Sequence, residues 1–219
     1  MHGSLLALPL LLAATAPAEP PSAWPLSVEV MIAADAARYA PPDLKRQLAK
    51  HRARLMAGVQ AAAAAEKGTR DAAAHRAAAA RAARHIAESI RRHVSFADVA
   101  YETGGLVHEV ASACWLSGGP FDPKDAAGAP RSGRFLGFGT SPFSEPEMLA
   151  ASVPAGKRGS ARDAYDASVT VSTRLLAWIW RAAGGDASAV GRHPRRRPRP
   201  GTDRLPRQPR HPEDLLSVS

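Results

Sequence analysis

The chain has 219 residues, of which 45% are apolar, and this is enough for a single domain with a hydrophobic core. Its only cysteine, Cys114, excludes an intrachain disulfide and an all-cysteine zinc site. The net charge of +9 is weak evidence for a nucleic-acid-binding fold, because residues 191–219 alone contribute +5 of it.

The amino-terminal sequence has the pattern of an export signal. Residues 4–16 form a short apolar run, SLLALPLLLAATA, and the small residues APA occupy 16–18. The run is too short to span a bilayer, and no later apolar segment is long enough to do so. We therefore expect residues 1–18 to be a signal peptide, with cleavage as late as residue 23, and the protein to be periplasmic or secreted. An uncleaved anchor or a misassigned start remains the alternative.

The first half of the chain has helical periodicity. Residues 24–40 predict one helix, which the two prolines at 41–42 end. Asp43 is a candidate amino-terminal cap for a second helix, whose apolar positions recur at helical spacing from Leu44 to Val59. The alanine-rich segment 61–93 is broken at Gly68 and restarts at Thr69 or Asp71.

The second half predicts two further long helices. Residues 96–116 form one of them, and its glycine pair at 104–105 suggests that another backbone packs closely there. Residues 117–160 predict a long irregular connection with a short helix near 145–151, and 161–183 predict the last helix, ended by glycines 184–185. The fold class expected is all-α, a single domain of roughly five helices over 24–185, followed by a disordered Arg/Pro-rich tail over 186–219.

Most catalytic signatures are missing from the sequence. It has no Gly-x-Ser-x-Gly elbow, and Cys114 beside Trp115 on an apolar face predicts a buried, inert thiol. The segment GRFLGFG at 133–139 lacks the strand–helix context of a phosphate loop and predicts a loop with aromatic anchors. The basic tail lacks aromatic residues that would stack on bases, so we expect at most nonspecific contact with anionic polymers.

Metal binding is the one sharp possibility that remains. Each candidate histidine taken alone is more simply a core or boundary residue with one hydrogen bond. The candidate ligands are His51, His75, His85, His93, His108, Glu29, Asp35, Asp98, Glu102 and Glu109.

The segment 96–112, FADVAYETGGLVHEVAS, resembles the bacterial zinc-dependent phospholipase C family and the single-strand-specific nucleases that share its fold. The matching residues are Phe96, Val99, Ala100, Gly105, Val107 and His108. The resemblance covers roughly 24–185, including a tryptophan before the first helix and the last helix, YDASVTVSTRLLAWIW. It implies an all-helical fold in which three zinc ions hold and hydrolyse a phosphodiester.

Only part of the family's ligand set has a counterpart. His108 matches the histidine of the His-x3-Asp pair, but Ser112 stands at the aspartate position. Trp24 matches the amino-terminal tryptophan ligand, and Glu29 stands where the first-helix histidine is expected. A second His-x3-Glu pair is missing, and no early aspartate is visible in the equivalent segment GVQAAAAAEKG. The resemblance thus implies a degenerate zinc site, without the full set of three ions.

Three functions follow as hypotheses. The first is an exported, non-catalytic relative that binds a phospholipid, a phosphate ester or a partner protein through the old cleft. The second is a residual metal-dependent phosphodiester hydrolase, which would need Glu29, His108 and a third ligand such as His51, His75 or His93 to converge. The third is a structural helical protein outside the family. The sequence leaves open whether the chain is an enzyme.

Overall fold

A computed structural model describes residues 24–66, 70–118, 121, 132–139, 144–152 and 160–187. In this part of the chain all regular structure is helical and forms one compact domain, which confirms the all-α prediction. The predicted signal peptide and nearly all of the predicted tail lie outside the described residues. The helices are α1 (Leu26–Tyr39), α2 (Pro42–Lys50), α3 (Arg52–Ala65), α4 (Ala72–Arg91), α5 (Phe96–Gly118), α7 (Pro146–Ala151) and α8 (Ala161–Ala182).

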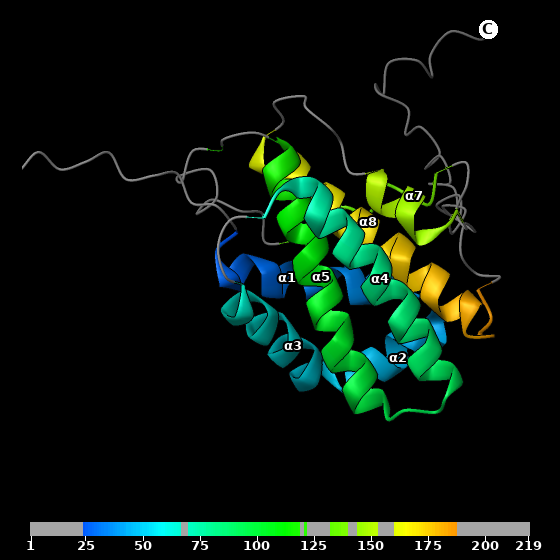
Figure 1. Ribbon diagram of the computed structural model, residues 1–219. Coiled ribbons are helices and arrows are strands. Elements are labelled where there is room, and N and C mark those ends of the chain that lie inside the picture. The colour runs from blue at the N-terminus through cyan, green and yellow to red at the C-terminus, as the bar shows by residue number, and fades with distance from the viewer. Residues whose placement is uncertain are drawn as a thin grey trace, which may run out of the picture.

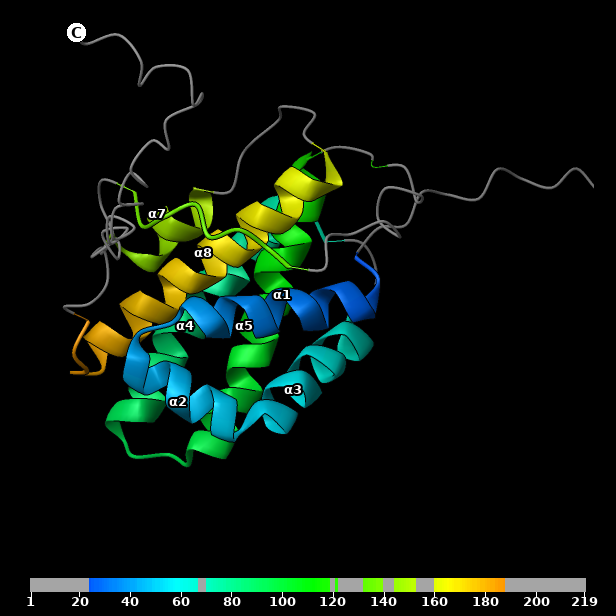
Figure 2. The ribbon, with the colours of Figure 1, turned by 180° about the vertical axis from the view of Figure 1, so that it is seen from behind.

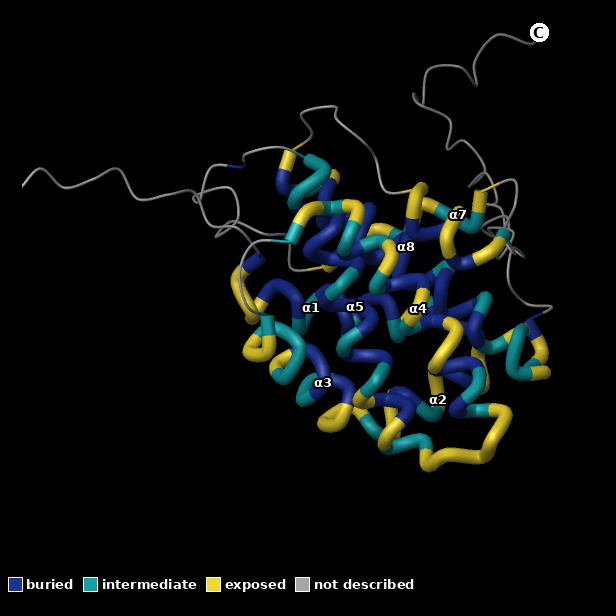
Figure 3. The backbone as a smooth tube through the Cα atoms, in the orientation of Figure 1, coloured by how far each residue is buried: buried dark blue, intermediate teal, exposed yellow. Residues whose placement is uncertain are grey.

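Helix α5 is the central element. It packs against α3 and α4, which flank it in Figure 1, and against α8. From behind, α1 and α8 lie across the other side of the domain (Figure 2). Most residues of α5 from Val99 to Trp115 are buried, and the four that are not are Tyr101, Glu102, Gly105 and Glu109. The outer sides of α3 and α4 alternate between buried and exposed positions (Figure 3). Polar side chains in the middle of α5 are therefore held in the protein interior.

The expected second helix is two helices, so the prediction of roughly five helices was too low. The chain breaks at His51, whose backbone has φ −106° and ψ 28°, and α3 starts at the next residue. Pro42 also begins α2 instead of only ending α1, because proline is well suited to the first helical turn, where its missing N–H is not needed.

The boundaries of α1, α4, α5, α7 and α8 agree with the predictions to within two residues. Helix α3 ends at Ala65, three residues before the predicted break at Gly68, and the capping residue of α2 is Pro41 and not the predicted Asp43. Of the two proposed starts of α4, the structure selects Asp71, whose carboxylate accepts a hydrogen bond of 2.7 Å from the backbone N–H of Ala74. Ser160 and Asp163 form a capping box at the start of α8, and Gly184 follows this helix with φ 87°. In the described ranges, no helix combines the length and apolarity needed to cross a membrane.

The predicted close approach at the glycine pair of α5 occurs at only one of the two residues. A Cβ on Gly104 would lie 2.2 Å from the carbonyl oxygen of Leu55, and a Cβ on Gly58 would lie 1.9 Å from that of Tyr101. Helices α3 and α5 therefore touch backbone to backbone at Gly58 and Gly104. Gly105, in contrast, faces open space, since a Cβ there meets nothing within 4 Å.

Candidate metal centre

Two buried histidines from different helices share one carboxylate. The Nε2 atom of His75 lies 3.1 Å from Oε1 of Glu66, and the Nε2 atom of His108 lies 3.1 Å from Oε2 of the same side chain. Their rings are 6.4 Å apart, centroid to centroid. Glu66 thus bridges α4 and α5.

The second ring nitrogen of each histidine faces its own carboxylate. Nδ1 of His108 lies 2.9 Å from Oε2 of Glu29, and Nδ1 of His75 lies 2.8 Å from Oε2 of Glu109. The result is a continuous row, Glu29–His108–Glu66–His75–Glu109, that draws on four helical segments.

Local sequence explains how these groups meet. Glu29 lies in the first turn of α1, where the helix dipole favours a negative charge. Glu66 is the residue that caps the carboxyl end of α3, and Asp71 starts α4 so that His75 falls in its first turns. The backbone contact of α3 with α5 then brings the end of α3 against the middle of α5, where His108 is buried.

The row is deepest at Glu29 and opens toward solvent at its other end. The side chains of Glu29, His75 and His108 are each 1% exposed, whereas Glu66 is 18% exposed and Glu109 is 17% exposed. Arg70, which is 36% exposed, lies at the outer end with its Nη2 atom 3.0 Å from Glu109 and 3.7 Å from Glu66. The outer groups can therefore reach water, and the histidines lie just beneath them.

Ionisable groups of opposite kinds alternate along the row. Each imidazole has one carboxylate hydrogen-bonded at Nδ1 and the Glu66 carboxylate 3.1 Å from Nε2. Arg70 pairs with the two partly exposed carboxylates, Glu66 and Glu109. Burial without such partners would cost several kcal/mol per charge, roughly, so the pairing explains how the groups tolerate the interior.

Two groups of the row, His108 and Glu109, have shifted pKa values. Burial lowers the pKa of His108, but its hydrogen bond to Glu29 and the charges of Glu29, Glu66 and Glu109 outweigh burial, so the pKa lies above its ordinary 6.5. For Glu109, burial raises the pKa, and the hydrogen bonds from His75 and Arg70 outweigh burial, so the pKa lies below its ordinary 4.5.

Two buried polar atoms on α5 have no hydrogen-bond partner in the described part of the chain. One is Nε2 of His108, from which Glu66 is close but lies off the direction of a good hydrogen bond. The other is the hydroxyl of Ser112, one helical turn further on. Buried polar groups without a hydrogen-bond partner are rare in native proteins, so each one needs an explanation, such as a bound ion or water.

The row contains the side-chain types that bind metal ions in proteins. Histidines that bind metals usually donate their other N–H to a carboxylate, as both histidines do here. As they stand, no three His, Cys, Asp or Glu side chains of the described residues surround a position for an ion. The reason is that the carboxylate of Glu66 lies between the two Nε2 atoms. Because Glu66 follows the last residue of α3, its side chain can turn aside without breaking that helix.

The sequence-predicted ligands divide into two groups. Glu29, His75, His108 and Glu109 meet in the row. Trp24 packs instead in an aromatic cluster, with ring centroids 4.6 Å from Trp115 and 6.2 Å from Tyr165. The remaining candidates make contacts elsewhere or lie at helix ends: Asp35, His51, His85, His93, Asp98 and Glu102.

Two further sequence predictions are confirmed. Cys114 is buried, and burial raises the pKa of its thiol to about 12, so it is not a nucleophile. The segment 133–139 is an irregular stretch whose aromatic residue Phe135 packs on Tyr39 and Phe138, with centroid distances of 5.4 and 4.7 Å.

Glu66 is the residue that the sequence interpretation missed. Glu66 follows an alanine run in the segment GVQAAAAAEKG, where the sequence showed no early aspartate ligand. A signal was present, because Glu66 is the only acidic residue between Asp43 and Asp71.

Comparisons with models of protein families, with curated proteins and with solved structures found no match to this chain. The function proposed below therefore rests on the geometry of the row and on the sequence pattern of 96–112.

Proposed function

We propose that this protein binds one divalent metal ion, with zinc as the best candidate, through Glu66, His75 and His108, and uses it to hydrolyse phosphodiesters. The observation that carries the proposal is the convergence of two Nε2 atoms on one carboxylate, while each Nδ1 atom is hydrogen-bonded to a further carboxylate.

The residue types fit zinc. Two imidazoles and one carboxylate are a ligand set of catalytic zinc sites, in which water takes the remaining position. When bound, such an ion would supply Lewis acidity and would lower the pKa of its bound water to about 7. The partial exposure of Glu66 gives water and substrate a route to the open position.

The other groups of the row would position these ligands. The carboxylates of Glu29 and Glu109 accept the Nδ1 protons, which leaves the Nε2 lone pairs for the ion and fixes both rings. We therefore assign Glu29 an orienting role instead of the ligand role that the resemblance implies. Arg70 lies at the outer end, where it pairs with Glu109 and Glu66, and it would have to leave one of them to contact an anionic ester oxygen.

The charges of the row also suit a divalent ion. Three carboxylates surround the two imidazoles, and binding through Nε2 would displace any proton there. We propose one ion and not three, because Ser112 offers a neutral hydroxyl in place of a carboxylate, which is a poor zinc ligand.

A second candidate is non-catalytic binding of a phosphate ester or phospholipid at the same place. The supporting observation is that the ionisable groups of the row are paired with groups of the opposite kind, so the row can persist as a structural network with Arg70 as the anion contact. Export by residues 1–18 is part of either proposal, and sequencing the amino terminus of the protein recovered outside the cytoplasm tests it.

The test is metal content together with hydrolysis. The wild type, stripped with a chelator and reloaded, should retain one zinc per chain and cleave a simple diester such as bis(p-nitrophenyl) phosphate. Glu66→Gln should lose both properties. The matched control is Glu102→Gln, on the same helix as His108, which breaks a carboxylate–histidine contact with His85 outside the row and should keep zinc.

The possible results separate the candidates. Zinc bound without hydrolysis would support a non-catalytic metal protein and refute the hydrolase. An absence of zinc in the wild type, with alkyl phosphate still bound through Arg70, would support the second candidate. An absence of both would leave the row as a purely structural network.

A further inference from the structure

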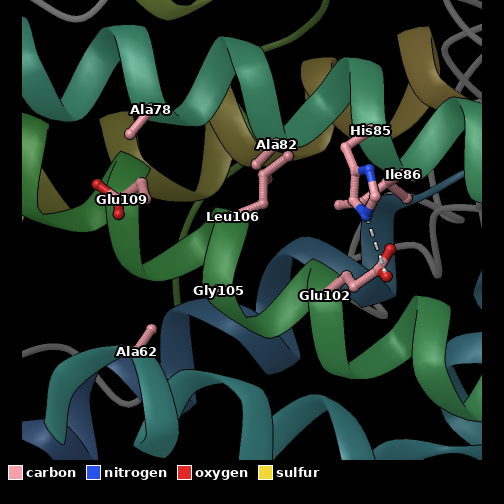
Figure 4. A pocket seen from close by; sticks show the side chains of 9 residues that line it. All are labelled: Ala62, Ala78, Ala82, His85, Ile86, Glu102, Gly105, Leu106 and Glu109. Carbon is pink, nitrogen blue, oxygen red and sulfur yellow. Dashed lines mark ion pairs between the residues drawn. The ribbon is translucent and has the colours of Figure 1, made fainter. Parts of the chain in front are cut away.

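A groove runs along α5 between α3 and α4. It has a volume of about 280 Å³ and is open to the surface. Figure 4 shows Ala62 of α3 on one side, Ala78 and Ala82 of α4 on the other, and Gly105 in the helix between them. A Cβ on Gly105 would meet nothing within 4 Å. The groove therefore exists because these positions on three helices carry a methyl group or no side chain at all.

The two ends of the groove are acidic. Glu102 lies at one end and Glu109 at the other, and the two turns of α5 between them are about 10 Å long (Figure 4). The side chain of Glu102 is 28% exposed and that of Glu109 is 17% exposed. The described residues that line the groove include no lysine or arginine. The groove is thus locally negative in a chain whose net charge is +9.

The lining between these two ends is apolar. Leu106 of α5 and Ile86 of α4 complete it, together with the alanines and Gly105. Among the described residues of this middle part, no side chain carries a charge or a hydrogen-bonding group. The middle of the groove therefore favours methylene groups over polar ones.

Both carboxylates can accept further hydrogen bonds. The oxygens of Glu102 face Nε2 of His85, at 3.4 Å, and the hydroxyl of Ser89, at 3.1 Å. The oxygens of Glu109 pair with two groups of the row described above. An ionised carboxylate offers about four acceptor sites, and an ammonium group has three N–H donors. An ammonium group can thus bind at either end without displacing these partners.

The lining discriminates among classes of ligand. An uncharged hydrocarbon would cover the two carboxylates without replacing the water that they lose. A chain with an anionic end, such as a fatty acid, would place like charges side by side. A linear chain with an ammonium group at each end matches both carboxylates and the apolar stretch between them.

We propose that this groove binds a linear aliphatic diamine. One ammonium group lies at Glu102, the other lies at Glu109, and the methylenes between them cover Gly105 and Leu106. The proposal requires no metal, because neither carboxylate is among the proposed zinc ligands. The net positive charge of the chain opposes nonspecific binding of a dication, so binding must come from the groove itself.

The test is calorimetric titration of the full chain, stripped of metal, with diaminobutane, diaminohexane, diaminooctane and diaminodecane. Each diamine is compared with the monoamine of equal chain length. Affinity should rise by up to about fourfold for each methylene buried against the walls. The rise should end once the two ammonium groups span the carboxylates. At that length the diamine should bind about tenfold more tightly than the monoamine, as expected for one more charge-assisted hydrogen bond.

Spermidine supplies a second comparison. It has the length of diaminooctane but carries a further ammonium group in its interior, which would lie against the apolar middle of the groove. It should bind more weakly than diaminooctane, since placing a charge against apolar groups is costly. Tighter binding of spermidine would show that charge alone governs the interaction and would overturn the proposal.

Glu102→Gln is the decisive variant. It keeps the size of the side chain and removes one charge, so the diamine should bind no more tightly than the monoamine. Gly105→Leu should weaken both ligands, because its side chain would enter the groove without a clash at Cβ. The matched controls are Glu88→Gln, which removes an acid of α4 that pairs with arginines outside the groove, and Ala77→Leu, at an exposed position of α4. Both controls should leave the affinities unchanged.

The results decide the proposal. A diamine preference in the wild type that is lost in Glu102→Gln and kept in Glu88→Gln supports it. Equal affinity for diamines and monoamines of the same length overturns it, as does a preference that persists in Glu102→Gln. Because the protein is stripped of metal, these results do not depend on zinc, and a failure here leaves the proposed function standing.

Discussion

Two acidic residues of α1 are buried within two turns of each other, and their surroundings differ. Asp35 accepts hydrogen bonds from the hydroxyl of Tyr165, at 3.0 Å, and from the backbone N–H of Gly133, and its other oxygen lies 3.3 Å from Arg38. Glu29 faces the imidazole of His108, whose far nitrogen has no well-directed hydrogen bond in the described part of the chain.

Asp35 has a structural role, whereas Glu29 is paired with a side chain that can gain or lose a proton near neutral pH. The partners of Asp35 keep their protons in the neutral pH range, and burial, followed by the charge of Asp35, raises the pKa of Tyr165 far above its ordinary 10. The hydrogen bonds of Asp35 with Gly133 and Tyr165 hold the segment 132–139 against α1 and α8. The partner of Glu29 is an imidazole, and in the proposed function it exchanges a proton for a metal ion. Burial alone does not mark a functional carboxylate; the chemistry of its partner does.

The largest effect should come from His108→Ala. It leaves Glu29 as a buried carboxylate without its cation and removes a proposed zinc ligand. Breaking a buried ion pair in this way costs about 3–5 kcal/mol, so the free energy of unfolding should fall by that amount in the metal-free protein. Denaturant unfolding measures the loss. An unchanged midpoint would mean that Glu29 and His108 are not paired in solution.

Asp35→Ala should have a smaller effect and leave zinc binding intact. It removes the acceptor of Tyr165 and Gly133, and each unsatisfied buried donor costs about 1–3 kcal/mol. Unfolding and zinc content measured together check the comparison. A loss of zinc in this variant would show that the two acidic regions are coupled, contrary to the distinction drawn above.

The pH dependence of stability should be subtler and confined to the Glu29 region. Because the pKa of His108 is raised on folding, its contribution is fully present below its ordinary value of 6.5 and is lost as the pH rises through the folded value. The metal-free protein should therefore lose stability on the alkaline side of 6.5. His108→Gln should flatten this decline, and His51→Gln, at the junction of α2 and α3, should not.

Zinc should reverse the sign of that dependence. Metal binding requires deprotonated imidazoles, so the stabilisation by saturating zinc should grow with pH over the same range. Thermal melts with and without zinc at matched pH values measure it. Parallel curves would argue against ligation through His75 and His108.

The sequence predicted the helices well because their signals are local. Caps such as Asp71 and Ser160 and the apolar period of α5 depend only on neighbouring residues. The break at His51 was missed because no glycine or proline marks it, and apolar spacing continues from Leu48 to Leu55 across it.

The candidate centre was only half predictable. His108 could be selected from the pattern of 96–112, Glu29 from its position in the first helix after Trp24, and His75 from its place on an apolar face. Their convergence on Glu66 depends on how α3, α4 and α5 pack, which no local pattern encodes. Glu66 lies at a helix end beside an alanine run, so only its isolation as a charged residue pointed to it.

The most direct test of the central claim is a zinc titration by calorimetry in buffers of different ionisation enthalpy, slightly below the folded pKa of His108. We expect one zinc per chain, with release of a proton from His108, and the loss of this binding in Glu66→Gln. Zinc binding without proton release, or binding that survives Glu66→Gln unchanged, would contradict the assignment of these residues as the metal centre.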